Sequence, residues 1–200
     1  MKNLSRFQNR ILVFLFLFIL TSCTGNDIII PEPPIPAVEY IKIDIPYVQQ
    51  PQGSNWCLPA SGTMIFNFYD TNVTQQQVAD NIINEDTGLG NTSKLIAYAK
   101  ELGYKTSFHN LTSEELIEVL KQKIPVIVGQ DFSLNYDIAH ARVYTGFDNE
   151  SEEFITNDPS SLLGEDYRIP YSKAIALNTI KPPYFRTTVI HPANVDFILP

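Results

Sequence analysis

The sequence predicts an α+β domain over residues 39–200, with a helical N-terminal half and an antiparallel β-sheet in the C-terminal half. Two patterns predict this fold class. Between residues 58 and 121 apolar residues recur with helical spacing, and beyond residue 125 short apolar runs alternate with turn residues. Helices followed by strands are typical of two packed lobes, and a cleft between the lobes is the expected place for a site.

The helical half follows a short strand predicted over residues 41–48. A helix over residues 58–69 has one apolar stripe, and its members are Ala60, Met64, Ile65 and Phe68. Pro59 fits because proline is tolerated in the first turn. Thr74 with Gln77, and Thr112 with Glu115, form capping boxes that open two more helices. The remaining expected elements are helices ending near 83 and 121, a helix over 93–102, and a strand over 105–109.

The second half changes to strand patterns. A continuous apolar run over residues 125–129 is typical of a buried strand. Residues 141–147 and 153–157 predict a hairpin around the turn at 148–151. Two further strands are expected over residues 187–190 and 195–199.

The first 38 residues predict export. Three basic residues precede an apolar run over 11–20, and small residues stand before Cys23, as in a secretory signal peptide. This run is about half of the roughly 20 residues that span a bilayer. Residues 20–23 (Leu-Thr-Ser-Cys) resemble the bacterial lipoprotein signal, which implies lipidation of Cys23 and anchoring to a bacterial membrane; an ordinary signal peptide is the alternative. Residues 24–38 contain four prolines and predict an extended tether.

Cysteine content and charge narrow the function classes. The chain has two cysteines, so lipidation of Cys23 would leave Cys57 unpaired, either buried and inert or reactive; a disulfide between them is the third option. Loss of residues 1–23 removes three basic and no acidic residues, which takes the formal net charge from −8 to −11. The absence of a basic cluster argues against nucleic acid as a partner. Three scattered histidines lack the short spacings of zinc sites, so no metal or cofactor is expected.

Cys57 is the candidate nucleophile. It stands where a polar loop becomes a helix, so free N–H groups and the positive end of the helix dipole favour its thiolate. A buried structural cysteine is the alternative. His140, at the start of the strand over 141–147, is the candidate base because a central strand holds a side chain rigidly. We interpret His109, at a strand end, as a surface or capping residue, and His191, in a loop, as structural.

Two further roles have candidates. Asp158 or Asn157, on the second strand of the hairpin, would orient the imidazole, and a carboxylate also stabilises imidazolium. The developing oxyanion needs donors, which the Cys57 backbone N–H and a side-chain amide would supply. The amide candidates in the preceding loop are Gln49, Gln50 and Gln52.

Several segments together resemble the papain-like cysteine peptidases, nearest to the family that removes double-glycine leaders from bacteriocins. The matching segments are 45–50 (Ile-Pro-Tyr-Val-Gln-Gln), 55–61 (Asn-Trp-Cys-Leu-Pro-Ala-Ser), 139–148 (Ala-His through Gly-Phe-Asp) and 155–159 (Ile-Thr-Asn-Asp-Pro). The resemblance implies a papain-like two-lobe fold. It also implies Cys57 as nucleophile, His140 as base, Asp158 as its orienter and Gln50 as the oxyanion glutamine.

Two positions depart from that family. Leu58 replaces a glycine common after the nucleophile, and Ala139 replaces a glycine common before the histidine. The function implied is a cysteine peptidase or amide hydrolase that acts on a peptide or protein through an acyl-enzyme. The alternatives are a deamidase or acyltransferase with the same triad, and an inactive lipoprotein that binds peptides.

Overall fold

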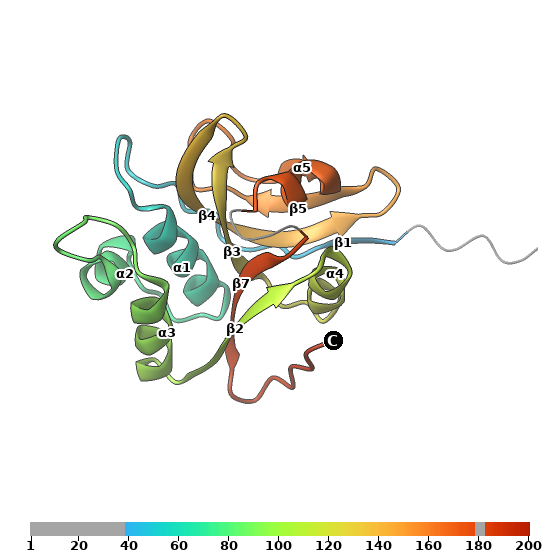
Figure 1. Ribbon diagram of the computed structural model, residues 1–200. Coiled ribbons are helices and arrows are strands. Elements are labelled where there is room, and N and C mark those ends of the chain that lie inside the picture. The colour runs from blue at the N-terminus through green and yellow to red at the C-terminus, as the bar shows by residue number, and fades with distance from the viewer. Residues whose placement is uncertain (1–38, 179–182) are drawn as a thin grey trace, which may run out of the picture. The chain divides into compact units, whose positions relative to one another are not determined.

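The computed structural model describes residues 39–178 and 183–200 (Figure 1). The expected signal peptide with Cys23 and the expected tether over 24–38 lie outside the described residues. All of the described residues belong to one compact unit. Within the described ranges, no helix has both the length and the apolar character needed to cross a membrane.

A seven-stranded antiparallel sheet forms the centre of the described domain. Six strands follow the order β2-β7-β3-β4-β5-β6, and β1 pairs with β4. The strands are β1 (Tyr40–Lys42), β2 (Tyr104–Leu111), β3 (Val126–Ser133), β4 (Tyr136–Asp148), β5 (Glu153–Asn157), β6 (Tyr167–Pro170) and β7 (Phe185–Pro192).

The helices lie mainly in the N-terminal half, as predicted. They are α1 (Cys57–Phe68), α2 (Gln75–Ile82), α3 (Thr92–Glu101), α4 (Ser113–Lys121) and α5 (Tyr171–Ala176). Both predicted capping boxes are present, at Thr74 before α2 and at Thr112 before α4. In Figure 1, α1, α2 and α3 gather at one end of the sheet and α5 lies over β5.

Helix α1 is the central element of the core. All nine residues from Leu58 to Phe66 are buried, because α2 and side chains of α3 cover one side of the helix and β4 the other. A Cβ added at Gly62 would lie 3.0 Å from the Leu95 side chain, so glycine allows α1 and α3 to pack closely. The Ser61 hydroxyl donates to the Ala141 carbonyl at 3.4 Å. The nucleophile-bearing helix is therefore fixed directly to the strand that carries His140.

Close packing also fixes β1 across β4. A Cβ at Gly146 would come 2.0 Å from the Ile41 carbonyl oxygen, so only glycine permits this approach of the two strands. The same position interrupts the pairing of β4 with β5, whose register shifts between Tyr144 and Gly146.

The structure corrects several expectations about strands. Residues 193–200 form a turn and an irregular tail rather than the strand predicted over 195–199. Both edges of β7 are already paired, with β2 and β3, so this segment has no sheet edge beside it. Instead its backbone bonds the side chain of Gln122, which accepts from Ile198 N–H at 3.0 Å and donates to Ile198 O at 2.8 Å.

Other strands are longer than predicted, or were missed. Strand β2 covers eight residues, so His109 lies inside it rather than at its end. His191 lies within β7 and is buried, not in a loop. Strand β4 begins at residue 136, so His140 lies inside the strand and not at its start. Strand β6 and helix α5 had no recognised signal, and their insertion among the strands makes the two halves less separate than expected.

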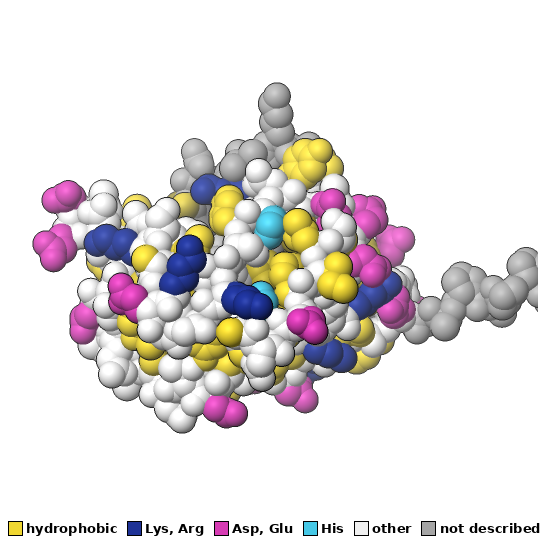
Figure 2. Space-filling view, turned by 90° about the horizontal axis from the view of Figure 1, so that it is seen from below, with side chains coloured by type: hydrophobic (Ala, Val, Ile, Leu, Met, Phe, Trp, Pro, Cys, Tyr) yellow, Lys and Arg dark blue, Asp and Glu magenta, His cyan; other side chains and the backbone are white. Residues whose placement is uncertain are grey.

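Figure 2 shows one face of the domain, on which hydrophobic side chains are scattered among polar ones and several acidic side chains lie together towards the right. On this face the Lys and Arg side chains stand singly among polar and acidic ones, without gathering into a basic patch.

Candidate functional site

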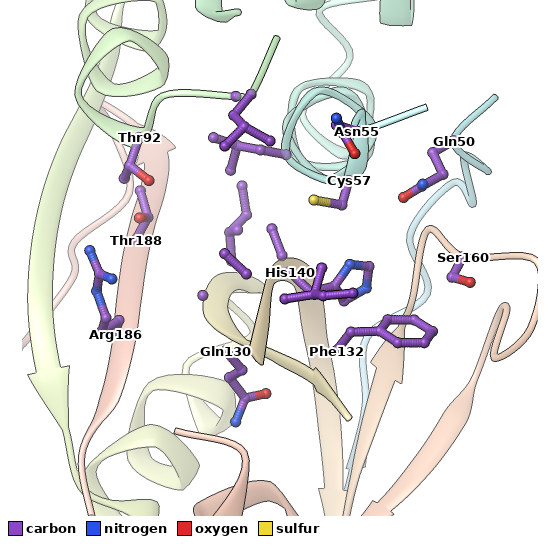
Figure 3. A pocket seen from close by; sticks show the side chains of 18 of the residues that line it. Gln50, Asn55, Cys57, Thr92, Gln130, Phe132, His140, Ser160, Arg186 and Thr188 are labelled. Carbon is purple, nitrogen blue, oxygen red and sulfur yellow. The ribbon is translucent and has the colours of Figure 1, made fainter. Parts of the chain in front are cut away.

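A cleft of about 620 Å³ lies where the N-terminus of α1 meets strands β3, β4 and β7 (Figure 3). Cys57 and His140 lie in the middle of it. Gln50, Asn55 and Ser160 lie towards one end, while Thr92, Arg186 and Thr188 lie at the other. The cleft therefore brings together three of the four residues predicted for the site.

Cys57 is the first residue of α1 and is a free, partly buried thiol. No side chain caps this helix end, and the first N–H groups of a helix lack carbonyl partners within it. The Cys57 backbone N–H is thus available to an oxygen in the cleft. The backbone N–H groups of Leu58 and Ala141 lie close enough to the sulfur to lower the pKa of the thiol.

The environment of the sulfur favours its ionised form. Burial alone would raise the pKa of the Cys57 thiol, but the hydrogen bond and the charge of His140 outweigh it and hold the pKa below its usual value. The two backbone N–H groups act in the same direction. Because the thiolate is the nucleophilic form of cysteine, this pairing prepares Cys57 for attack on a carbonyl.

His140 connects the thiol to a carboxylate. Its side chain is buried, and Nε2 lies 2.9 Å and 3.1 Å from the two carboxylate oxygens of Asp158. Nδ1 is then left to bond the Cys57 thiol. Burial disfavours the imidazolium, yet the hydrogen bonds with Asp158 and Cys57 raise the pKa of His140 above its usual value. The ring of Phe132 meets the imidazole edge-on, with centroids 5.1 Å apart, and limits its rotation.

Asp158 is fully buried and held from several sides. Its Oδ1 accepts a hydrogen bond from the Ser160 N–H at 2.8 Å, and its backbone carbonyl accepts one from the Tyr47 hydroxyl at 3.0 Å. Burial would raise the pKa of the carboxyl, but the contacts with His140 and Arg142 hold it below its usual value. Asn157 points elsewhere, because its Oδ1 accepts from the backbone N–H of Asp166 at 3.0 Å. The geometry therefore pairs His140 with Asp158 and not with Asn157.

Arg142 is part of this arrangement and was missed in the sequence. It is completely buried, and its Nε donates to Asp158 Oδ2 at 2.8 Å. Its Nη1 donates to Gln130 Oε1 at 3.0 Å, and the same oxygen accepts the Tyr144 hydroxyl at 2.7 Å. A signal was available: Arg142 is a charged residue in an apolar strand, two positions after His140, so both side chains face the same way.

Gln50 is the loop glutamine that lines the cleft. Its Nε2 donates to the Ser54 carbonyl at 2.8 Å, and its backbone N–H donates to Pro159 O at 2.9 Å. One of the two N–H bonds of Nε2 is therefore used, and Oε1 is buried without a partner in the described part of the chain. The other candidates, Gln49 and Gln52, are exposed and do not line the cleft.

The remaining histidines take no part in the cleft. His109 belongs to β2, and His191 bonds the Pro192 carbonyl through Nδ1 and packs on Phe197. Among the residues that the structure describes, no group of three or more His, Cys, Asp or Glu side chains is placed to hold a metal ion.

Leu58 lines the cleft but is largely buried. Its side chain is buried against Gly90, where an added Cβ would come 2.8 Å from the Leu58 Cβ. Glycine at position 90 thus provides the room that the leucine needs. Ala139 is exposed at the rim of the cleft.

The fold has known structural counterparts. One is a double-glycine motif protease from an AMS/PCAT transporter in complex with a leader peptide, with 20% identity, a TM-score of 0.56, and coverage of 76% of this chain and 94% of that one. Another is the peptidase domain of Streptococcus ComA, a bifunctional ABC transporter of a quorum-sensing pathway, with 17% identity, a TM-score of 0.57, and coverage of 75% and 98%. A C39-like peptidase of Bacillus anthracis shows 20% identity, a TM-score of 0.58, and coverage of 76% and 98%.

These likenesses establish the fold, which is the papain-like arrangement of helices and antiparallel sheet that the sequence predicted. No curated protein sequence matches the chain significantly. The model of one family, described as the Peptidase_C39 like family, matches residues 42–182. The match spans well over half of the sequence and includes Cys57, His140, Asp158 and Gln50. The chain therefore belongs to the Peptidase_C39 like family.

Proposed function

We propose that this protein is a cysteine peptidase that hydrolyses peptide bonds with Cys57 as nucleophile, His140 as base and acid, and Asp158 as the group that orients His140. The observation that carries the proposal is the Cys57 thiol beside His140 in an open cleft, with His140 hydrogen-bonded to the buried Asp158. Membership of a peptidase family supports it. A structural relative bound to a leader peptide supports a peptide or protein as the substrate.

The geometry supports formation of an acyl-enzyme. The Cys57 thiolate attacks the carbonyl carbon of the scissile bond, and the displaced electron pair collects on the carbonyl oxygen. The Cys57 backbone N–H and the second N–H of the Gln50 amide donate to this oxyanion. His140 transfers its proton to the departing amine as the C–N bond breaks, which leaves a thioester.

Water completes the cycle. His140 takes a proton from a water molecule, whose oxygen attacks the thioester carbonyl. The C–S bond then breaks, the sulfur leaves as thiolate, and the new carboxylic acid is released. No step requires a metal or a cofactor.

Position and rigidity support these roles. The imidazole is fixed by Asp158 on one side and Phe132 on another, so Nδ1 faces the sulfur before substrate arrives. The Gln50 backbone N–H donates to the carbonyl of the residue after Asp158, so the loop that carries Gln50 is linked to the segment that carries the carboxylate. Such preorganisation is what acyl transfer needs, because donors already in place require no reorganisation during the reaction.

The test is covalent labelling with an epoxide peptide probe, followed by mass spectrometry of the modified residue. We expect modification of Cys57 in the wild type, and its loss in His140→Ala. His109→Gln is a matched control, because His109 lies on β2 outside the cleft, and it should label like the wild type. Labelling of Cys57 at the rate of an ordinary thiol would refute the proposal.

We also propose that the protein is exported and anchored to a bacterial membrane through lipid on Cys23. The support is the sequence of residues 1–23, with its basic start, apolar run and Leu-Thr-Ser before the cysteine. Metabolic labelling with an alkyne fatty acid should mark the wild type and not Cys23→Ala. Equal labelling of both would contradict the anchor.

A further inference from the structure

Arg186 stands out among the residues that line the cleft. The lining contains three ionisable side chains, Cys57, His140 and Arg186, and no aspartate or glutamate among the described residues. Two of the three belong to the proposed catalytic apparatus. Arg186 is thus the one permanently charged side chain that this lining offers to a substrate.

The guanidinium of Arg186 has no carboxylate partner within the described ranges. The other described arginines are paired, Arg142 with Asp158, and Arg168 with Asp148 and Glu153. Arg186 instead lies over the ring of Phe108, 5.9 Å from its centroid, and remains exposed. An arginine stacked on an aromatic ring keeps its N–H groups directed outward, in the fork that matches a carboxylate.

The sheet register locates Arg186 relative to the sulfur. Ala141, whose backbone N–H lies close to the Cys57 sulfur, pairs directly with Gly129, and Gly129 pairs directly with Arg186. Two strand spacings separate Ala141 from Arg186, which amounts to about 10 Å. An extended peptide advances about 3.4 Å per residue, so Arg186 lies opposite a substrate side chain about three residues or fewer from the scissile bond.

Small and apolar residues shape the space between the two points. A Cβ added at Gly129 would meet nothing within 4 Å, so the floor of the cleft is open there. Leu89, Phe108 and Ile138 are exposed apolar residues on the cleft walls. A carboxylate that enters this end is partly desolvated beside apolar walls and meets a single fixed cation, which strengthens their attraction.

We infer that Arg186, with Phe108 and Thr188 beside it, forms a specificity subsite for a substrate carboxylate near the scissile bond. The inference rests on the proposed peptidase function and adds a substrate class, namely peptides with Asp or Glu close to the cleavage position. A free C-terminal carboxylate has the same chemistry and is the second possible source.

The experiment compares cleavage of N-acetylated, C-terminally amidated peptide libraries by wild type, Arg186→Gln and Arg186→Glu. We expect the wild type to prefer Asp or Glu at one position near the cleavage point by about tenfold in kcat/KM over Gln or Asn. Arg186→Gln should lose that preference, and Arg186→Glu should favour Lys or Arg at the same position. Arg168→Gln is the matched control, because Arg168 lies outside the cleft, and it should keep the preference.

Two further arms separate the outcomes. The best neutral peptide is offered with a free or an amidated C-terminus, and a preference for the free acid would identify a chain end as the bound carboxylate. Epoxide probes that carry Glu or Gln are compared for the rate of Cys57 alkylation. Fast alkylation without a Glu preference, or a preference that survives in Arg186→Gln, overturns the subsite alone. Slow alkylation by both probes refutes the peptidase proposal instead.

Discussion

The middle of the cleft and one of its ends differ in how their charges are held. In the middle, the Cys57 thiol lies beside His140, and His140 is hydrogen-bonded to Asp158, with Arg142 buried behind them. At one end Arg186 is exposed on a wall of apolar residues and has no acidic partner in the described domain. The difference shows that the same residue type serves two purposes here. A buried arginine with a carboxylate stabilises a fixed arrangement, whereas an exposed one beside a cleft remains free for a ligand.

The largest expected effect comes from removing His140 from the middle of the cleft. His140→Ala removes the base that ionises Cys57 and protonates the leaving amine, so kcat/KM for a peptide should fall by about 10⁴-fold. Peptide hydrolysis followed by mass spectrometry measures it. A variant that retained more than a tenth of the activity would show that His140 is not the base.

The two arginines should differ sharply in their effect on stability. Arg142→Met leaves Asp158 buried without its permanently charged partner and should reduce the free energy of unfolding by about 3–5 kcal/mol. Arg186→Gln removes an exposed charge and should change it by about 0.5 kcal/mol or less. Urea denaturation measures both. The double variant Arg142→Met/Asp158→Asn should recover part of the loss, and failure to do so would mean that Arg142 acts through packing rather than charge.

The next largest difference is expected between alanine substitutions at Gly146 and at Gly129, because the space for a side chain differs at these two positions. Gly146→Ala forces a Cβ against the Ile41 carbonyl and should reduce the free energy of unfolding by about 1–3 kcal/mol. Gly129→Ala, in the open floor near Arg186, should raise it by about 0.5 kcal/mol, because alanine loses less backbone entropy. Thermal unfolding of both variants is the measurement. Equal destabilisation would show that the floor at Gly129 is not open.

The kcat/KM that depends on the Cys57–His140 pair should change by about tenfold per pH unit on either side of its optimum. The pKa of Cys57 lies below its usual value of 9.0 and that of His140 above its usual 6.5. Activity should therefore rise with pH as the thiol ionises and fall as His140 loses the proton that it gives to the leaving group. The hydrogen-bonded imidazolium also contributes to stability, fully below about pH 6.5, and this contribution is lost as pH rises through the higher folded-state pKa. A flat profile of kcat/KM between pH 4 and 10 would contradict the pairing.

Much of the site could be predicted from the sequence because its residues stand at the ends of helices and strands that local sequence patterns predict. Cys57 opens a helix, and His140 and Asp158 flank a hairpin whose pairing the apolar pattern predicts correctly over residues 141–157. The choice between Asp158 and Asn157 depends on which side chain faces the imidazole. The register shift of β5 against β4 near Gly146 changes which side of the sheet each of these two residues faces, and no local sequence pattern indicates this shift.

Other features depend on contacts between distant segments. The predicted apolar strand ends at residue 129, yet the next residue, Gln130, is buried in β3 and its side chain bonds those of Arg142, Tyr144 and Asn178. Polar residues that satisfy one another in the core are indistinguishable from loop residues in a single sequence. The same reason explains why Arg142, sixteen positions from its partner Asp158, was not recognised.

The attachment of residues 40–50 has a consequence for protein turnover. Strand β1 pairs with β4, the Tyr47 hydroxyl bonds the Asp158 carbonyl, and the Gln50 backbone bonds the Pro159 carbonyl. Residues 40–50 are thus held on the sheet by non-covalent contacts, which would persist if the chain were cut in the loop at 51–56. Nicking of that loop by another protease would leave the upstream piece attached, and the two fragments would separate only under denaturing conditions.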